Sequence, residues 1–210
     1  MGAAEAYPST PSKLTALSDL AQKVAPVILA GSRTMPLRPD LTAVLPAMRR
    51  GTVIEIDGRG ATSLALAMAS GSSAAGSWVA VVGLPALSMV AAAEAGLDLE
   101  RTAVVVDPGE RWATVVAALT DAIDVVLTGR PARLRPADAR RLTSRVRERG
   151  SVLMVVGGSW PDRTDLHLTV ESAQWSGLGD GHGYLRKRRM EIILDGRGAA
   201  GRRRRRSLEI

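Results

Sequence analysis

The hydrophobic residues between positions 52 and 157 form short continuous runs, and the segments between the runs have helical spacing. Runs rich in Val, Ile and Leu are typical of strands that are buried on both faces. We therefore predict strands at Thr52–Asp57, Trp78–Gly83, Thr102–Asp107, Asp124–Thr128 and Val152–Gly157. The segments between them predict helices at Ala61–Ala69, Ala86–Ala95, Arg111–Ala122 and Pro136–Arg149. Strands that alternate with helices indicate an α/β fold with a mainly parallel sheet flanked by helices.

The pattern changes after Trp160, where polar and apolar residues begin to alternate. Two such runs, Leu166–Trp175 and Tyr184–Leu194, flank a glycine-rich segment. They predict an antiparallel β-hairpin at the C-terminal end of the core. The Gly-, Ala- and Arg-rich sequence from Gly196 to Ile210 predicts a disordered basic tail.

The first fifty residues differ from the core. Leu14, Leu17, Leu20 and Val24 have the spacing of an apolar helical stripe, which would pack either on the chain's own core or on a partner. Three prolines between residues 30 and 50 predict a connection with at most one helical turn. The expected organisation is an N-terminal helix and linker (1–50), a core with its hairpin (51–195) and a flexible arginine-rich tail (196–210).

The composition excludes several classes of protein. The chain has no cysteine, so disulfides, thiolate metal sites and a cysteine nucleophile are excluded. The N-terminus does not have the pattern of a signal peptide, and Gly83 and Pro85 interrupt the most apolar window. We therefore expect a soluble cytoplasmic protein, associated with the nucleoid and without membrane contact.

Positive charge is concentrated near the C-terminus. Removing the five charges of Arg202–Arg206 from the net charge of +7 leaves +2 for the rest of the chain. A flexible arginine run would bind nucleic acid without sequence specificity. A second basic run lies on a predicted strand, where successive side chains point to opposite faces, so it is either a solvated edge or a surface for an anionic partner. The candidate partner or DNA contacts are Arg186, Lys187, Arg188, Arg189, Arg202, Arg203, Arg204, Arg205 and Arg206.

The first predicted strand leads into a glycine turn and a helix of small residues, which is how a phosphate-binding loop begins. That loop needs four residues between its glycines, followed by Lys and Ser or Thr. Here only Arg59 separates Gly58 from Gly60, Ala61 takes the position of the lysine, and Thr62 takes that of the metal-binding hydroxyl. A tight strand-to-helix turn explains this segment better, and we expect it to bind no cofactor.

Two other kinds of site each lack a residue that they require. A dinucleotide site would need an acidic residue at the end of the next strand, where the sequence has Gly83-Leu84-Pro85 instead. The two histidines, His167 and His182, have no cysteine or evident carboxylate cluster beside them, and no G-x-S-x-G motif is present. We therefore expect no metal site and no catalytic residue.

Three segments resemble the nucleotide-binding core of RecA. LPAMRRGTVIEIDGRGATSLAL resembles the strand and P-loop region, SWVAVVGLPALS the second core strand, and AIDVVLTG the Walker B strand. The resemblance covers residues 42 to 195, and the hairpin corresponds to the one that follows the RecA core. It implies that Pro85 takes the place of the catalytic glutamate and Gly129 that of the metal-binding aspartate. Phosphoryl transfer needs the loop, the metal ligand and the water-positioning carboxylate together, so we expect no enzymatic activity.

The runs AAGSWVAVVGLPAL, DPGERWATVVAAL and GLGDGHGYLRKRRMEII are also similar to ImuA-type proteins of actinobacteria (ImuA′), the RecA-related accessory proteins of the mutasome. This resemblance implies a non-catalytic adaptor in SOS-induced translesion DNA synthesis. Its partner would be the ImuB-type inactive Y-family polymerase homologue and, through it, an error-prone polymerase and the sliding clamp, with RecA a further candidate. Residues 165–210 are the expected docking surface.

Three alternatives remain open on the sequence. One is a nucleotide-regulated ATPase with a non-standard pocket, which ATP titration would reveal. Another is a SulA-type cell-division inhibitor, whose over-expression would cause filamentation. The last is a plain DNA-binding module that binds without Arg202–Arg206.

Overall fold

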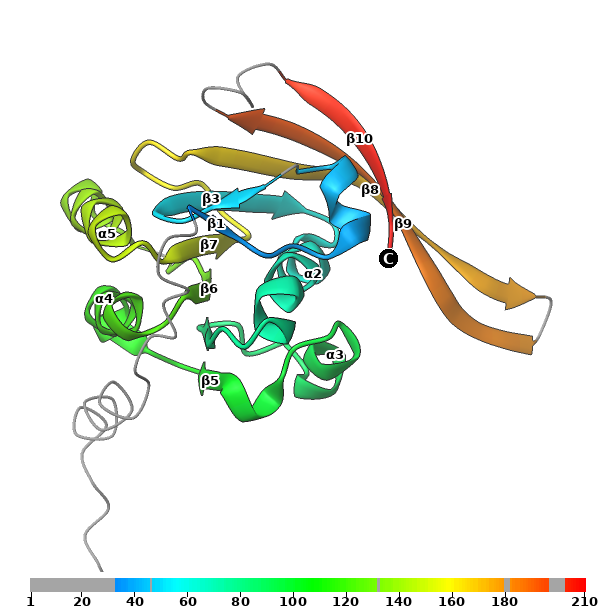
Figure 1. Cartoon of the computed structure of the whole chain (residues 1–210), viewed down its shortest axis with the longest axis horizontal. Helices are drawn as coiled ribbons and strands as arrows, with labels where there is room; N and C mark the ends of the chain where they lie inside the picture. The colour runs from blue at the N-terminus through cyan, green and yellow to red at the C-terminus, as the bar shows by residue number, and fades with distance from the viewer. Residues whose placement is uncertain (1–32, 46, 132, 180–181, 197–202) are drawn as a thin grey trace, which may run out of the picture.

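A parallel sheet forms the centre of the protein, in a computed structural model that describes residues 33–45, 47–131, 133–179, 182–196 and 203–210 (Figure 1). Its strands are β3 (Thr52–Gly58), β4 (Val79–Val82), β5 (Thr102–Val105), β6 (Val125–Gly129) and β7 (Val152–Val156). Each lies where the apolar runs predict a strand, with ends that differ by at most two residues. The helix predicted at residues 14–24 lies outside the described residues.

Three further strands continue the sheet on one side. β8 (Leu166–Gly179) pairs in parallel with β3, β9 (His182–Gly196) pairs antiparallel with β8, and β10 (Arg204–Glu209) pairs antiparallel with β9. The complete order is β10-β9-β8-β3-β7-β6-β4-β5. The predicted hairpin is confirmed, and its far end projects beyond the sheet as an arm (Figure 1). Register shifts between Val170 and Ser172, and between Ser176 and Leu178, mark irregularities in the arm strand.

The tail is ordered where it forms β10. Arg204 lies opposite Leu194 and Glu209 opposite Arg189, and Leu208 is 3% exposed within the same hydrophobic cluster as Leu194. The prediction of a disordered tail is therefore wrong for residues 203–210. The composition of this segment predicts disorder because its arginines outnumber the one apolar side chain, Leu208, that anchors it to the core. Backbone pairing with β9, however, requires no particular side chain, so a basic segment can still form a strand.

Helices cover both faces of the sheet (Figure 1). The helix α2 (Ala61–Ala74) packs on one face, and α4 (Trp112–Ala122) and α5 (Pro136–Arg149) pack on the other. The helix α3 (Met89–Glu94) begins later than predicted because Pro85 and Ala86 form a turn. Short 3-10 helices lie at η2 (Leu99–Arg101) and η3 (Gly109–Arg111). No helix among the described residues is long and apolar enough to cross a bilayer.

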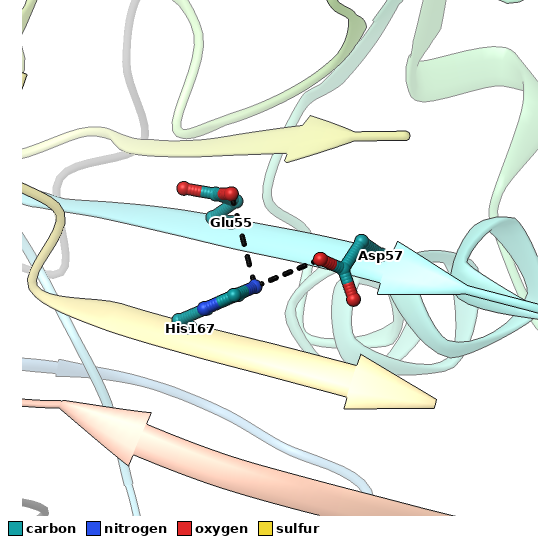
Figure 2. Close-up of side chains that lie close together, drawn as sticks. All are labelled: Glu55, Asp57 and His167. Carbon is teal, nitrogen blue, oxygen red and sulfur yellow. Dashed lines mark hydrogen bonds and ion pairs between the residues drawn. The ribbon is translucent and has the colours of Figure 1, made fainter. Parts of the chain in front are cut away.

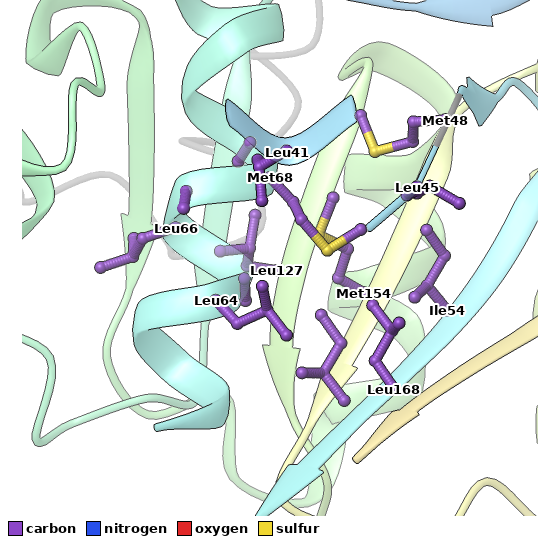
Figure 3. Packing of buried hydrophobic residues seen from close by; sticks show 14 of the residues in the cluster. Leu41, Leu45, Met48, Ile54, Leu64, Leu66, Met68, Leu127, Met154 and Leu168 are labelled. Carbon is purple, nitrogen blue, oxygen red and sulfur yellow. The ribbon is translucent and has the colours of Figure 1, made fainter. Parts of the chain in front are cut away.

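The segment before β3 packs as part of the core. It contains β1 (Thr34–Met35), the single helical turn η1 (Pro39–Ala43) and β2 (Met48–Arg49), which pairs with β1. Leu41, Leu45 and Met48 are buried in one cluster with Met68 of α2 and Met154 of β7 (Figure 3). The helical turn agrees with the sequence prediction, but the described part of the predicted linker covers the core and does not connect separate units.

Candidate functional site

The glycine turn between β3 and α2 contains only two residues, Arg59 and Gly60. Gly58 has φ +87° and Gly60 has φ +109°, both in the left-handed region that glycine adopts readily. A Cβ atom on Gly58 would lie 2.2 Å from the carbonyl oxygen of Val170, so the turn packs directly against β8. A phosphate-binding loop needs a longer run of backbone N–H groups that surrounds the anion. The structure confirms a tight strand-to-helix turn.

Arg188 of β9 covers the first turn of α2. Its Nη1 atom donates a hydrogen bond to Ser63 Oγ at 2.6 Å, and a Cβ atom on Gly60 would lie 2.6 Å from its Nη2 atom. Its guanidinium carbon lies 5.1 Å from the centre of the Trp175 ring. Partial burial lowers the pKa of Arg188 from its ordinary value. The Arg188 guanidinium thus lies at the N-terminus of α2, which is the end of the helix that binds the anion in a P-loop. Ala61, which takes the position of the P-loop lysine, is buried.

The two positions to which the RecA resemblance assigns the catalytic carboxylates, Pro85 and Gly129, lie along the same edge of the sheet, after β4 and at the end of β6. Gly129 ends β6, and a Cβ atom there would lie 2.3 Å from the carbonyl oxygen of Gly83. Trp112 Nε1 donates to the carbonyl oxygen of Gly129 at 3.0 Å. Pro85 is exposed in the turn after β4. The backbone around Gly129 therefore leaves no room for an aspartate side chain.

A cluster that the sequence analysis missed lies on the face of the sheet opposite α2. Glu55 and Asp57 of β3 and His167 of β8 offer one ligand atom each, and these atoms lie within 4.8 Å of one another. Figure 2 shows the His167 Nε2 atom pointing toward both carboxylates. The expectation that no carboxylate cluster lies near His167 is wrong, because the parallel pairing of β3 and β8 places Glu55 directly opposite His167. The available signal was a pair of acids two residues apart in an otherwise apolar strand.

The basic run on β9 divides between the two faces of the sheet, as strand geometry predicts. Lys187 and Arg189 are exposed and bind Glu209 of β10 at 2.7 and 3.5 Å, whereas Arg188 points to α2. Nothing is described for the side chain of Arg186, and Arg202 lies outside the described residues. Among the tail arginines, Arg205 binds Glu171, and all four described members are exposed: Arg203, Arg204, Arg205 and Arg206.

The arginines of α5 are largely paired with acidic side chains. Arg145 and Arg149 both bind Asp121 of α4, at 2.7 and 3.0 Å, and Arg147 binds Asp165 at 3.5 Å. The hydrogen bond with Asp121 raises the pKa of Arg145. The two pairs with Asp121 join α5 to α4, and all three pairs leave fewer unpaired cations on α5 than its sequence indicates.

Comparisons with known proteins give both a family and a fold. A family model described as the MT3502 N-terminal domain matches residues 43–162, more than half of the 210-residue chain. A Mycobacterium tuberculosis (strain ATCC 25618 / H37Rv) protein described as "Uncharacterized protein Rv3395c" is 42% identical over 102 residues, which make up 48% of this chain and 50% of that protein. The chain thus matches about half the length of this curated relative.

Two solved structures share the architecture. A RadB recombinase superposes with a TM-score of 0.56 at 15% identity, over 80% of this chain and 92% of that one. A KaiC-like protein, PH0186 from Pyrococcus horikoshii OT3, has a TM-score of 0.56 at 13% identity, over 83% of this chain and 93% of that one. At this level of identity the likeness establishes the fold, which is RecA-like.

Proposed function

The chain belongs to the MT3502 N-terminal domain family, and we propose that it is a non-catalytic RecA-like adaptor of an error-prone translesion synthesis complex. The observation that carries the proposal is the position of Arg188, which covers the first turn of α2 beside a turn of only two residues. The proposed partners are the ImuB-type polymerase homologue and, through it, an error-prone polymerase and the sliding clamp. RecA is a further candidate partner.

The region that corresponds to a nucleotide-binding site supports a role in binding other proteins rather than in catalysis. Phosphoryl transfer depends on a phosphate cradle, a metal ligand and a carboxylate that positions water. The turn at Gly58 is too short for the cradle, and the backbone of Gly83 fills the space that an aspartate at residue 129 would need. The complete sheet and its covering helices nevertheless remain, so the RecA-like core provides a rigid support for binding surfaces.

The hairpin arm of β8 and β9 is the proposed docking surface. Its root is held on the sheet by parallel pairing of β8 with β3 and by buried Met190 and Ile192. Trp175 on the arm is 52% exposed and lies beside Arg188, on the face of β9 opposite to Lys187 and Arg189. Tryptophan and arginine are enriched among residues that dominate binding energy at protein interfaces. An apolar pocket on the partner, with an acidic residue at its edge to face Arg188, would match the exposed indole.

The test is capture of the ImuB-type partner by the full chain and by point variants. Deletion of residues 165–210 is unsuitable because it removes three strands of the sheet and several core side chains. Trp175→Ala should weaken binding about tenfold or more, as expected for loss of a central anchor residue. Val90→Ala is the matched control, since Val90 is an exposed apolar residue on α3, away from the arm. Equal affinity of the two variants would reject the arm as the docking surface.

An ATP titration tests the non-catalytic part of the proposal separately. Calorimetry with ATP and Mg²⁺ should detect no binding in the micromolar range, whatever the partner result. Micromolar affinity would instead favour the nucleotide-regulated ATPase.

Exposed tail arginines favour a second, additional function, which is sequence-independent DNA binding. Arg203, Arg204 and Arg206 are exposed and have no acidic ion-pair partner among the described residues. Duplex binding would then depend strongly on salt. Replacing all three by alanine should lower the slope of log K against log salt by about 0.9 for each phosphate that the variant no longer neutralises. An unchanged slope would exclude these side chains as phosphate contacts.

A further inference from the structure

We propose that Glu55, Asp57 and His167 form a binding site for a divalent transition-metal ion, with Zn²⁺ as the preferred ion. The site follows from strand geometry. Glu55 and Asp57 are two residues apart on β3, so their side chains share one face, and His167 lies opposite Glu55 on the neighbouring parallel strand. Neither the proposed adaptor role nor its docking surface depends on this site.

The distances suit a single ion. The His167 Nε2 atom lies 3.0 Å from Asp57 Oδ2 and 3.7 Å from Glu55 Oε1. Two ligand atoms that bind Zn²⁺ tetrahedrally at its usual bond lengths lie about 3.3–3.4 Å apart. The two distances to His167 fall on either side of this value, and all three ligand atoms lie within 4.8 Å of one another, so side-chain rotations could bring them to one ion. Figure 2 shows the interactions of Glu55 and Asp57 meeting at the ring nitrogen of His167, between β3 and β8.

The charge balance of the cluster also points to a cation. Glu55 is only 8% exposed, and no lysine or arginine among the described residues forms an ion pair with Glu55 or Asp57. The Asp57 Oδ1 atom is buried and has no hydrogen-bond partner within the described part of the chain. Glu55 is thus almost fully removed from water and Asp57 is partly removed, and two neighbouring carboxylates in this situation are costly unless a positive charge lies beside them. A bound divalent cation would provide that charge and a partner for the carboxylates.

A neighbouring group holds one ligand in place. The backbone N–H of Trp160 donates to Glu55 Oε2 at 3.2 Å, which leaves Oε1 directed toward His167. Such outer-shell hydrogen bonds orient metal ligands in many proteins. The Trp160 side chain is itself fixed, because its Nε1 atom donates to Thr143 Oγ1 of α5 at 3.3 Å. The orientation of Glu55 therefore depends on the packing of α5 on the sheet.

The donor set selects the type of ion. One imidazole nitrogen and two carboxylate oxygens suit Zn²⁺, whereas Mg²⁺ prefers six oxygen ligands and retains several of its waters. The side chains of Asp57 and His167 are 34% and 37% exposed, so a fourth position would be open to water or to an outside ligand. The ion would also join β3 to β8 at the root of the hairpin arm, directly before the turn at Gly58.

The test uses the full chain without an affinity tag, treated with EDTA and then titrated with ZnCl₂ by calorimetry. We expect one Zn²⁺ per chain, a higher melting temperature with Zn²⁺, and affinity for Mg²⁺ at least a hundredfold lower. Asp57→Asn and His167→Ala should each weaken Zn²⁺ binding at least tenfold. His182→Ala is the matched control, since it removes the other histidine and should leave binding unchanged.

Two results would overturn the proposal. One is Zn²⁺ binding by His167→Ala that equals that of the unaltered chain, with circular dichroism showing that the variant is folded. The other comes from the unaltered chain alone, so it does not depend on whether a variant folds. X-ray absorption of its zinc complex should show one imidazole among nitrogen and oxygen neighbours at about 2.0–2.1 Å. A spectrum without an imidazole contribution, or absence of zinc binding, would reject the site.

Discussion

Arg188 donates a hydrogen bond to Ser63 Oγ at 2.6 Å, which joins the middle of β9 to the first turn of α2. The two residues are 125 positions apart in the chain. The same guanidinium lies over the ring of Trp175, so one side chain links the glycine turn, the core and the arm. A positive charge at a helix N-terminus is unfavourable by itself, and the hydrogen bond and the aromatic contact offset this cost.

Replacing Arg188 by alanine should lower the free energy of unfolding by about 1–2 kcal/mol, because the hydrogen bond and the cation–π interaction are both removed. Urea denaturation measures the change. The control is Arg189→Ala, which removes an exposed cation that has only a long ion pair with Glu209 and should change stability by less than about 0.5 kcal/mol. Equal effects of the two variants would show that the hydrogen bond to Ser63 contributes nothing specific.

Gly58→Ala should destabilise the protein by more than about 3 kcal/mol, because left-handed backbone strain adds to a clash with the Val170 carbonyl. Gly109→Ala isolates the strain alone: Gly109 has φ +55°, and a Cβ atom there would meet no atom within 4 Å. It should cost about 1 kcal/mol. Thermal unfolding of both variants measures the two changes in stability. Similar losses of stability would mean that the backbone of β8 at Val170 moves aside at little energetic cost.

Gly129→Ala tests whether the position that the RecA resemblance assigns to the Walker B aspartate can accept a side chain. Its Cβ atom would lie 2.3 Å from the Gly83 carbonyl oxygen, so the ends of β4 and β6 would have to separate. We expect a loss of about 3 kcal/mol or more in denaturant titration, comparable to severe overpacking of a core. A stable variant would indicate that a single substitution could restore an acidic residue there.

Leu208→Ala should cost about 2–3 kcal/mol, because it removes the buried anchor of β10 and leaves a cavity at the sheet edge. Ser207→Ala, at the adjacent exposed position, should change stability by less than about 0.5 kcal/mol. Hydrogen exchange of the amides of residues 204–209 provides a local measurement. Loss of their protection in Leu208→Ala, with protection retained in the central strands, is the expected pattern.

The ion pair between Lys187 and Glu209 predicts a pH dependence. The hydrogen bond from Lys187 holds the pKa of the Glu209 carboxyl below its ordinary value of 4.5. Because this pKa is lower in the folded state, the ion pair stabilises the protein above the ordinary pKa, and the stabilisation disappears as pH falls through the folded pKa. The difference in unfolding free energy between wild type and Glu209→Gln should therefore decrease below about pH 4.5. Screening by about 1 M salt should also reduce it at neutral pH.

The central sheet could be predicted because its signals are local. A strand that is buried on both faces has to be apolar throughout, which is visible in β4 and β7 without knowledge of their neighbours. The bounds of α5 were predicted correctly because both of its ends are marked in the sequence. Pro136 is the first helical residue, a position that proline favours because its ring fixes φ near the helical value, and Gly150 adopts φ +69° after the last residue.

The candidate sites could not be predicted in the same way, since they depend on which strands are neighbours. Asp57 and His167 are 110 positions apart and meet only because β8 pairs with β3 and not with β7. Nothing in the spacing of either strand specifies that choice. The sequence did not predict that residues 204–209 form the strand β10, for a related reason. An edge strand needs only a neighbouring strand to pair with and one side chain that anchors it to the core.

The register shift in β8 determines how the arm is oriented. Val170 faces α2, and strict alternation from that residue would turn Ser172 and Gln174 toward the same face and Trp175 away from it. The ladder instead passes over Glu171, so Ala173 lies opposite Met190 and Trp175 opposite Arg188. One additional residue in the strand thus reverses the phase of the residues from Ser172 to Ser176, where the second register shift follows. The face of the arm on which the Trp175 indole lies is therefore determined by the number of backbone residues in the strand, and not by contacts of the side chain.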